Sequence, residues 1–89
     1  MKQITLNGKK MVDRDSAHEY IASKLGFPDY YGKNLDALAD CVSEFCSDKY
    51  IRFSHYEEAE RNLGEYAEAI VEVFSDIAED NQRIKFKKL

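Results

Sequence analysis

Two aspartates one helical turn apart are the residues of this 89-residue chain whose types and spacing most clearly suggest chemistry. Asp36 and Asp40 stand at positions i and i+4, so in a helix their side chains project from the same side. No lysine or arginine follows them until Lys49. Because like charges at this spacing destabilise a helix by about 0.2–0.5 kcal/mol, the pair predicts either a solvated polar face or a surface that meets the cations of a partner.

The residues just before this pair are aromatic. In the stretch "PDYYGKNLDALADC", residues 28–41, Tyr30 and Tyr31 stand in a predicted loop over residues 28–33. Asn34 is a suitable N-cap for the helix that follows. Tyrosines beside carboxylates are typical of protein–protein interfaces, so they favour a binding surface over a merely solvated face. The apolar stripe of the helix lies away from the aspartates and consists of Leu35, Leu38, Val42 and Phe45.

Paired carboxylates also carry out acid–base catalysis, for example in glycoside hydrolases. Such a site needs a substrate groove, and a small domain of 89 residues offers little concavity. The sequence contains no Gly-rich phosphate loop, nucleophile elbow or metal-ligand cluster. We therefore expect a binding protein rather than an enzyme, with no cofactor and no bound metal.

Apolar spacing predicts the elements that must position these residues. "QITLNG", "KYIRF" at residues 49–53 and "RIKFKK" alternate in the manner of strands. Helical spacing separates them, so the predicted order is strand, two helices, strand, two helices, strand. Strands joined by helical crossovers pair in parallel. We expect one α/β domain, residues 1–89, with a three-stranded parallel sheet packed by about four helices. Asn7-Gly8 could instead close a hairpin onto residues 9–12.

Several residues are predicted to begin or end the helices. Ser16 to Glu19 and Ser54 to Glu57 both match the capping box, in which a hydroxyl and a glutamate bond free helix amides. Gly26 and Gly64 stand where the first and third helices should end. His18 and His55 fall inside the two predicted helix starts, so we expect capping or surface roles for them.

The two cysteines, Cys41 and Cys46, both fall in the predicted helix that carries the aspartates. Five residues apart in a helix, their side chains point about 140° away from each other. This geometry predicts free thiols rather than a disulfide. Two cysteines and two histidines also provide no zinc-ligand spacing.

The net charge of −4 is unevenly distributed along the chain. Residues 34–80 contain 13 acidic and 3 basic side chains, whereas residues 1–33 and 81–89 together contain 10 basic and 4 acidic ones. An acidic middle of this size repels nucleic acid and attracts a basic partner.

Five lysines near predicted strand ends are the candidates for a phosphate-binding patch: Lys9, Lys10, Lys85, Lys87 and Lys88. Lysines at such positions more often protect sheet edges against aggregation, so we expect no direct binding to nucleic acid. No apolar run approaches the roughly 20 residues of a membrane span, and the N-terminus lacks the apolar stretch of a signal peptide. We therefore expect a cytoplasmic protein that does not bind membranes.

The stretch at residues 28–41 resembles the signature of the barstar family, intracellular inhibitors of secreted bacterial ribonucleases such as barnase. Its Tyr-Tyr-Gly, Asn-Leu-Asp-Ala-Leu and Asp-Cys segments match position for position. "ITLNG" near the start and "VFSDIAED" near the end are also similar, so the resemblance covers most of the chain. It implies the same sheet with four helices, and a protein that blocks a ribonuclease active site in a one-to-one complex.

The resemblance also implies roles for individual residues. Asp40 would occupy the position of an RNA phosphate among basic residues of the enzyme, and Asp36 would pair with a further arginine. Tyr30 would pack against the catalytic histidine, and Gly32 would let the backbone approach closely. Asp76 stands in the place of a family glutamate that also reaches a basic residue. The expected partner-binding set is completed by Tyr31, Asn34, Ala39 and Ser43.

The chain departs from the family pattern at several positions. Ala39 and Phe45 stand where the family has tryptophan, Glu44 replaces a glycine and Lys33 replaces a glutamate. Ala39 removes contact area, and Lys33 reverses a charge that would favour a basic enzyme. We therefore expect the partner to be a small basic ribonuclease related to barnase rather than barnase itself. A binding or immunity module for a different basic partner is the alternative.

Overall fold

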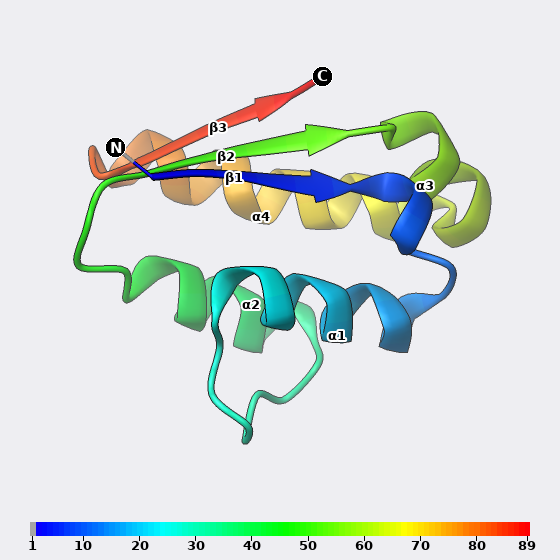
Figure 1. Ribbon diagram of the computed structural model, residues 1–89, viewed down its shortest axis with the longest axis horizontal. Coiled ribbons are helices and arrows are strands. Elements are labelled where there is room, and N and C mark those ends of the chain that lie inside the picture. The colour runs from blue at the N-terminus through cyan, green and yellow to red at the C-terminus, as the bar shows by residue number, and fades with distance from the viewer. Residues whose placement is uncertain (1) are drawn as a thin grey trace.

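The computed structural model describes residues 2–89 and contains three strands and four helices (Figure 1). The strands form one parallel sheet in the order β1-β2-β3, so β2 is central. This arrangement confirms the predicted α/β fold class. The elements are β1 (Lys2–Asn7), α1 (Arg14–Leu25), α2 (Leu35–Ser43), β2 (Lys49–Ser54), α3 (Tyr56–Leu63), α4 (Glu65–Asp80) and β3 (Ile84–Lys88).

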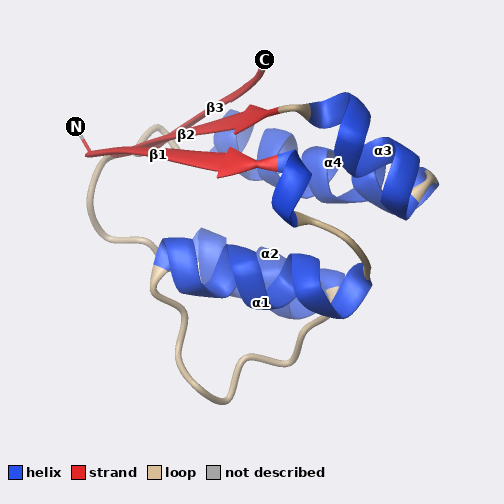
Figure 2. Ribbon diagram, turned by 45° about the vertical axis from the view of Figure 1, so that its right-hand side comes forward, coloured by secondary structure: helices blue, strands red, loops and turns tan. Residues whose placement is uncertain are grey.

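The alternating pattern of the strands explains how the layers pack. Side chains on one face of the sheet are buried, and α1 packs against β1 while α4 packs against β3. The second helix, α2, packs on α4, and α3 lies beyond the carboxyl ends of the strands (Figures 1 and 2). The largest fully buried side chains of this core include Leu6, Ile21, Leu38, Ile51, Phe53, Ile70 and Phe74.

The other face of the sheet carries polar and basic side chains, and in the described part of the chain no helix covers it (Figure 1). Lys85 and Lys87 of β3 are exposed there. Arg52 of the central strand donates from Nη2 to the Thr5 hydroxyl of β1 at 3.0 Å. Lys88 instead places its Nζ over the ring of Tyr56, 4.4 Å from the ring centroid, so its ammonium does not join Lys85 and Lys87 on this face.

The chain turns sharply after β1, where a hairpin was the alternative. Gly8–Lys10 forms a short 3-10 helix, η1, which packs against α3. The backbone of Gly8 is buried, and a Cβ atom at this position would overlap the carbonyl oxygen of His55. The hairpin is therefore wrong, and glycine is required at position 8 by the close approach of the two segments.

Both predicted capping boxes are wrong, for different reasons. The N-cap of α1 is Asp13, whose Oδ1 accepts from the Ser16 amide at 2.8 Å while the Ser16 hydroxyl accepts from the Asp13 amide at 3.0 Å. Ser16 is thus the third residue of the helix and not its cap. Ser54 ends β2, because it pairs with Asn7 of β1, and the N-cap of α3 is His55 without a side-chain hydrogen bond.

The predicted ends of α1 and α3 are confirmed. Gly26 and Gly64 have φ angles of 73° and 64°, the left-handed region that glycine adopts most easily, and they end α1 and α3 as predicted. No helix within residues 2–89 combines the length and the apolar character needed to cross a membrane.

Glycine at position 8 gives a direct test of this packing. We expect Gly8→Ala to lower the free energy of unfolding by about 2–3 kcal/mol, because the added methyl group must displace the backbone of His55. Urea unfolding followed by circular dichroism measures this change. The matched control is Gly32→Ala, where the methyl group would lie 3.4 Å from its nearest neighbours and should change stability by less than about 1 kcal/mol. Equal effects of the two substitutions would contradict the proposed contact.

Candidate functional site

The loop between α1 and α2, residues 26–34, projects from the molecule on the side away from the sheet (Figures 1 and 2). A turn in this loop is closed by a hydrogen bond from the Tyr31 amide to the Pro28 carbonyl oxygen, at 3.0 Å. Tyr30 lies in the turn, and this residue is 88% exposed. An aromatic ring held in water at this level of exposure is available to a partner.

Tyr31 faces the opposite way, into the core. Its hydroxyl lies 2.7 Å from Nδ1 of His18 on α1, and Nε2 of the same imidazole lies 2.6 Å from the Tyr66 hydroxyl on α4. A neutral imidazole therefore donates to one tyrosine and accepts from the other. These bonds join α1, α4 and the loop. Tyr31, which we expected to contact a partner, thus holds the loop that carries Tyr30, whether or not it also contacts a partner.

His18 is only 1% exposed, so the predicted capping or surface role is wrong for this residue. Burial lowers its pKa from the ordinary 6.5, and the nearby Asp15 carboxylate partly opposes this shift. Burial also raises the pKa of Tyr31. The buried cluster is therefore uncharged at neutral pH. No pattern in the sequence connects residues 18, 31 and 66, so sequence reasoning missed it.

The second half of the loop is held by local contacts. The Asn34 side-chain oxygen accepts from the Ala37 backbone amide at 2.7 Å, as expected of an N-cap. The Asn34 side-chain nitrogen donates to the Gly32 carbonyl oxygen at 3.3 Å. Lys33 has a left-handed φ of 54° and pairs with Glu19 of α1 at 3.0 Å. Asn34 thus orders the start of α2 whether or not it also contacts a partner.

The carboxylates of Asp36 and Asp40 are exposed and unpaired on α2. Among residues 2–89, no lysine, arginine or histidine lies within 4.0 Å of either carboxylate. The guanidinium of Arg14, which lines the same surface depression as Asp36, lies over the Tyr66 ring at 4.4 Å from its centroid. The charges of the two aspartates are therefore not neutralised within the described part of the chain.

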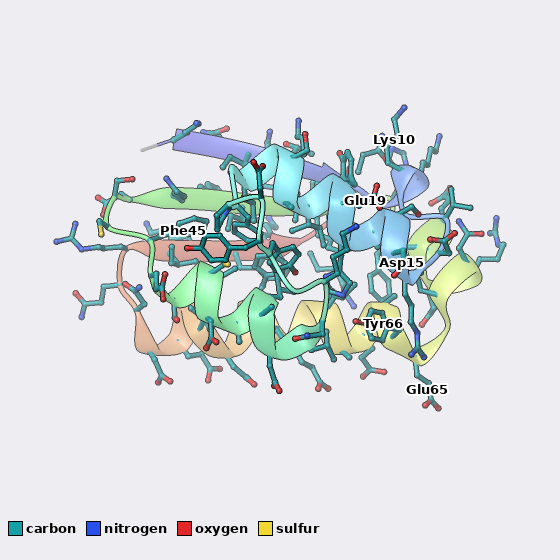
Figure 3. All side chains as sticks on the ribbon, turned by 90° about the horizontal axis from the view of Figure 1, so that it is seen from below. Lys10, Asp15, Glu19, Phe45, Glu65 and Tyr66 are labelled. Carbon is teal, nitrogen blue, oxygen red and sulfur yellow. The ribbon has the colours of Figure 1, made fainter. Side chains whose placement is uncertain are left out.

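The neighbouring helix α4 adds further negative charge. Asp76, the other acidic residue expected to reach a partner, is exposed on α4, which packs alongside α2. Figure 3 shows acidic side chains along the outer edge of α4, where Glu65 is labelled. Sequence reasoning singled out Asp76 alone, although the spacing of three or four residues was visible. The helix has no lysine or arginine, and its exposed acids are Glu65, Glu68, Glu72, Asp76, Glu79 and Asp80.

The carboxyl end of α2 comes earlier than predicted. The helix ends at Ser43, whose hydroxyl donates to the Asp40 carbonyl oxygen at 2.9 Å. Cys46 lies beyond this end, so the placement of both cysteines in one helix is wrong. Both thiols are free, with Cys41 half-buried and Cys46 exposed. Ala39, another expected contact residue, is half-buried on α2.

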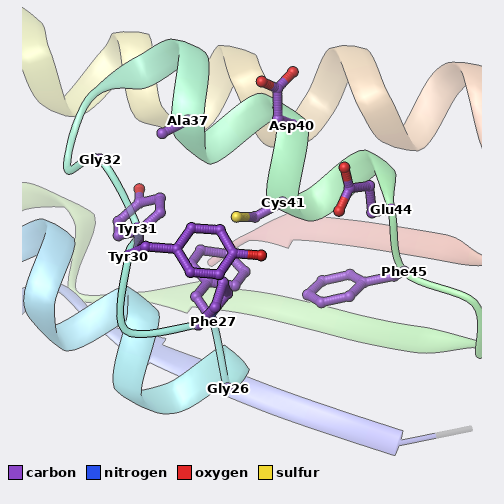
Figure 4. A pocket seen from close by; sticks show the side chains of 11 residues that line it. Gly26, Phe27, Tyr30, Tyr31, Gly32, Ala37, Asp40, Cys41, Glu44 and Phe45 are labelled. Atoms are coloured by element: carbon purple, nitrogen blue, oxygen red, sulfur yellow. The ribbon is translucent and has the colours of Figure 1, made fainter.

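A groove of about 410 Å³ lies between the loop and α2 (Figure 4). Its half-buried floor includes Phe27, Cys41 and Phe45, whereas the exposed side chains of Asp40 and Glu44 stand at its margin. Burial raises the pKa of the Cys41 thiol, and these two carboxylates raise it further. The groove is thus apolar at its base and negative at its edge. Among residues 2–89, no group of three His, Cys, Asp or Glu side chains could hold a metal ion.

This chain matches a known protein family over its whole length. The family model described as "Barstar (barnase inhibitor)" matches residues 1–89. The chain is also 33% identical over 81 residues to the protein named "Putative ribonuclease inhibitor YrdF" of Bacillus subtilis (strain 168). That match covers 90% of this chain and 89% of the relative.

We expect the buried imidazole to make the stability of the protein depend on pH. Because the pKa of His18 is lower in the folded than in the unfolded state, the unfolded state binds more protons near the ordinary value of 6.5. The stabilisation is complete above pH 6.5 and is lost as pH falls through the folded-state pKa. We therefore expect the free energy of unfolding, measured by urea titration, to decrease as pH is lowered from 7.5 towards 5.

His18→Gln should remove most of this decrease, because glutamine has a donor and an acceptor but does not titrate. The matched control is His55→Gln, which removes an exposed imidazole and should leave the pH dependence in place. The Asp13 carboxylate does not interfere, because the hydrogen bonds from Ser16 lower its pKa below 3.8. The same pH slope in the wild type and in His18→Gln would contradict the assignment.

Proposed function

Because this chain belongs to the barstar family, we propose that it is a protein inhibitor of small, basic, secreted bacterial ribonucleases of the barnase type, and that it binds them one-to-one. One observation carries the proposal: Asp36 and Asp40 are exposed on one helix without a cation within 4.0 Å among residues 2–89. A cleft that holds RNA phosphates must be cationic. Carboxylates on a rigid helix can replace those phosphates as partners of its basic residues.

The proposed complex places α2 and the loop before it in the active-site cleft. Asp40 would take the position of a phosphate, and Asp36 would pair with a second basic residue. Tyr30 would pack on the catalytic histidine, which its 88% exposure permits. Gly32 is exposed, and a methyl group there would meet only Ala37 and Asn34, at 3.4 Å. Because the fold does not require glycine at this position, its benefit would be close approach of the enzyme.

The order of the loop supports this role. Binding a mobile loop costs the free energy of fixing it, and a preorganised loop avoids much of that cost. The hydrogen bond of Tyr31 to His18 and the capping bond of Asn34 fix the segment on both sides of Gly32 before any partner arrives. Tyr31 and Asn34 would therefore contribute to binding through the conformation of the loop.

The surrounding charge supports a basic partner. Asp76 and the other exposed acids of α4 extend the negative surface beside α2. Fields of this kind speed the encounter of oppositely charged proteins and weaken with salt, because the Debye length falls from about 30 Å at 0.01 M to about 8 Å at 0.15 M ionic strength.

The proposal is tested by inhibition of a panel of small secreted bacterial ribonucleases, barnase included, at low and at physiological salt. We expect one-to-one inhibition of at least one enzyme, with faster association at low salt. Titration of active enzyme with inhibitor measures the stoichiometry. If no enzyme of the panel is inhibited at either salt concentration, the ribonuclease target is wrong, and a different basic protein becomes the expected partner.

Substitution of the central carboxylate tests the geometry. We expect Asp40→Asn to weaken the complex by at least about tenfold, because a desolvated cation of the enzyme would lose its charged partner. Asp36→Asn should have a smaller effect, and Tyr30→Ala should also weaken binding. The charge-matched control is Glu57→Gln on α3, at a distance from α2 (Figure 1). An Asp40→Asn complex as tight as that of Glu57→Gln would contradict this orientation.

A further inference from the structure

We propose that the groove between the loop and α2 binds an arginine side chain of the inhibited ribonuclease, separately from the basic residues that meet Asp36 and Asp40. This inference rests on the proposed function, since it names the chemistry of one further contact in the same complex. Two features of the groove support it: its aromatic floor and its acidic margin.

The floor of the groove is aromatic. The ring of Phe27 lies 4.9 Å from that of Tyr31 and 6.1 Å from that of Phe45, measured between centroids. Phe27 and Phe45 are half-buried, so parts of both rings remain accessible from the groove. The flat faces of aromatic rings attract guanidinium groups, which combine delocalised positive charge with a planar, weakly hydrated surface.

The margin of the groove is acidic. Glu44 follows Asp40 by four residues, and both carboxylates stand on the α2 side of the groove (Figure 4). Within the described residues 2–89, neither has a cation within 4.0 Å. If Asp40 binds the phosphate-site cations of the enzyme, Glu44 is left to pair with whatever enters the groove. A carboxylate beside an aromatic surface fits a guanidinium, which can donate two parallel hydrogen bonds to it.

One ring of the floor already attracts a cation within the protein. The ammonium of Lys49 lies over the ring of Phe45, 4.8 Å from its centroid. Lys49 is not among the residues that line the groove, and none of the lining residues is basic. An apolar occupant would cover the rings but would desolvate Glu44 without pairing it. An arginine can both stack on the rings and donate hydrogen bonds to the Glu44 carboxylate.

The experiment is a double-mutant cycle between the inhibitor and the enzyme that it inhibits best. Each surface arginine of that enzyme is replaced by glutamine, and the affinities for wild type and for Glu44→Gln are compared. We expect Glu44→Gln to weaken the wild-type complex by about tenfold. We also expect one arginine substitution to weaken binding of the wild-type inhibitor but not of Glu44→Gln, because both changes remove the same contact.

Two controls make the outcome decisive. Glu57→Gln removes the same charge from α3 and should show no coupling to any arginine. Phe45→Leu keeps an apolar side chain but removes the ring, so it should weaken binding while thermal unfolding verifies the fold. If Phe45→Leu weakens binding and Glu44→Gln does not, the occupant is apolar and the inference is wrong. It is also wrong if no arginine couples to Glu44.

The alkylation rate of Cys41, at the floor of the groove, provides an independent test. The arginine stem should shield the Cys41 thiol in the complex, so its alkylation by iodoacetamide should slow several-fold relative to the free inhibitor. The exposed Cys46 thiol serves as an internal reference in the same sample. Unchanged alkylation of Cys41 in the complex would overturn the inference. The proposed function itself would survive that result, since it depends on inhibition by the wild type; without such inhibition, both proposals fail.

Discussion

The hydrogen bonds of one buried imidazole connect α1, α4 and the loop that carries Tyr30. His18 bonds Tyr31 of the loop and Tyr66 of α4, and no regular secondary structure orders residues 26–33 otherwise. Loss of the imidazole would leave two tyrosine hydroxyls without their shared partner, at a cost of about 1–3 kcal/mol for each buried group that stays unsatisfied. The exposed position of Tyr30 and the groove beside it both depend on this buried contact.

The proposed binding surface and the fold make opposite demands on α2 and α4. Their inner sides bury Leu38, Val42, Ile70 and Phe74, which stabilise the core. Their outer sides carry carboxylates that repel one another and have no cation within 4.0 Å among residues 2–89. The apolar contacts therefore have to offset a repulsion that would be useful only in the proposed complex. Natural proteins often retain such local conflicts at functional sites.

The features that could be predicted from the sequence are those that depend on the local spacing of residues. The strands, the helices, the N-cap at Asn34 and the end of α1 at Gly26 follow from residues within a few positions of one another. The predicted capping box at Ser54 is wrong because pairing with Asn7 of β1 extends β2 to this residue, and the local sequence contains no sign of that pairing. The cluster around His18 spans 48 residues, and the groove joins a loop to the far end of a helix. Only the folded chain brings these residues together.

The uncovered face of the sheet has a consequence for how two molecules would first meet. Arg52, Lys85 and Lys87 lie on the side of the sheet that faces away from the helices, whereas the exposed acids of α2 and α4 lie on the helical side of the molecule. This separation gives the protein an electric dipole moment in addition to its net charge of −4. In the field of a cationic partner the molecule would feel a torque that turns its helices forward before contact. Rotational search, which limits ordinary association rates, would then be shortened.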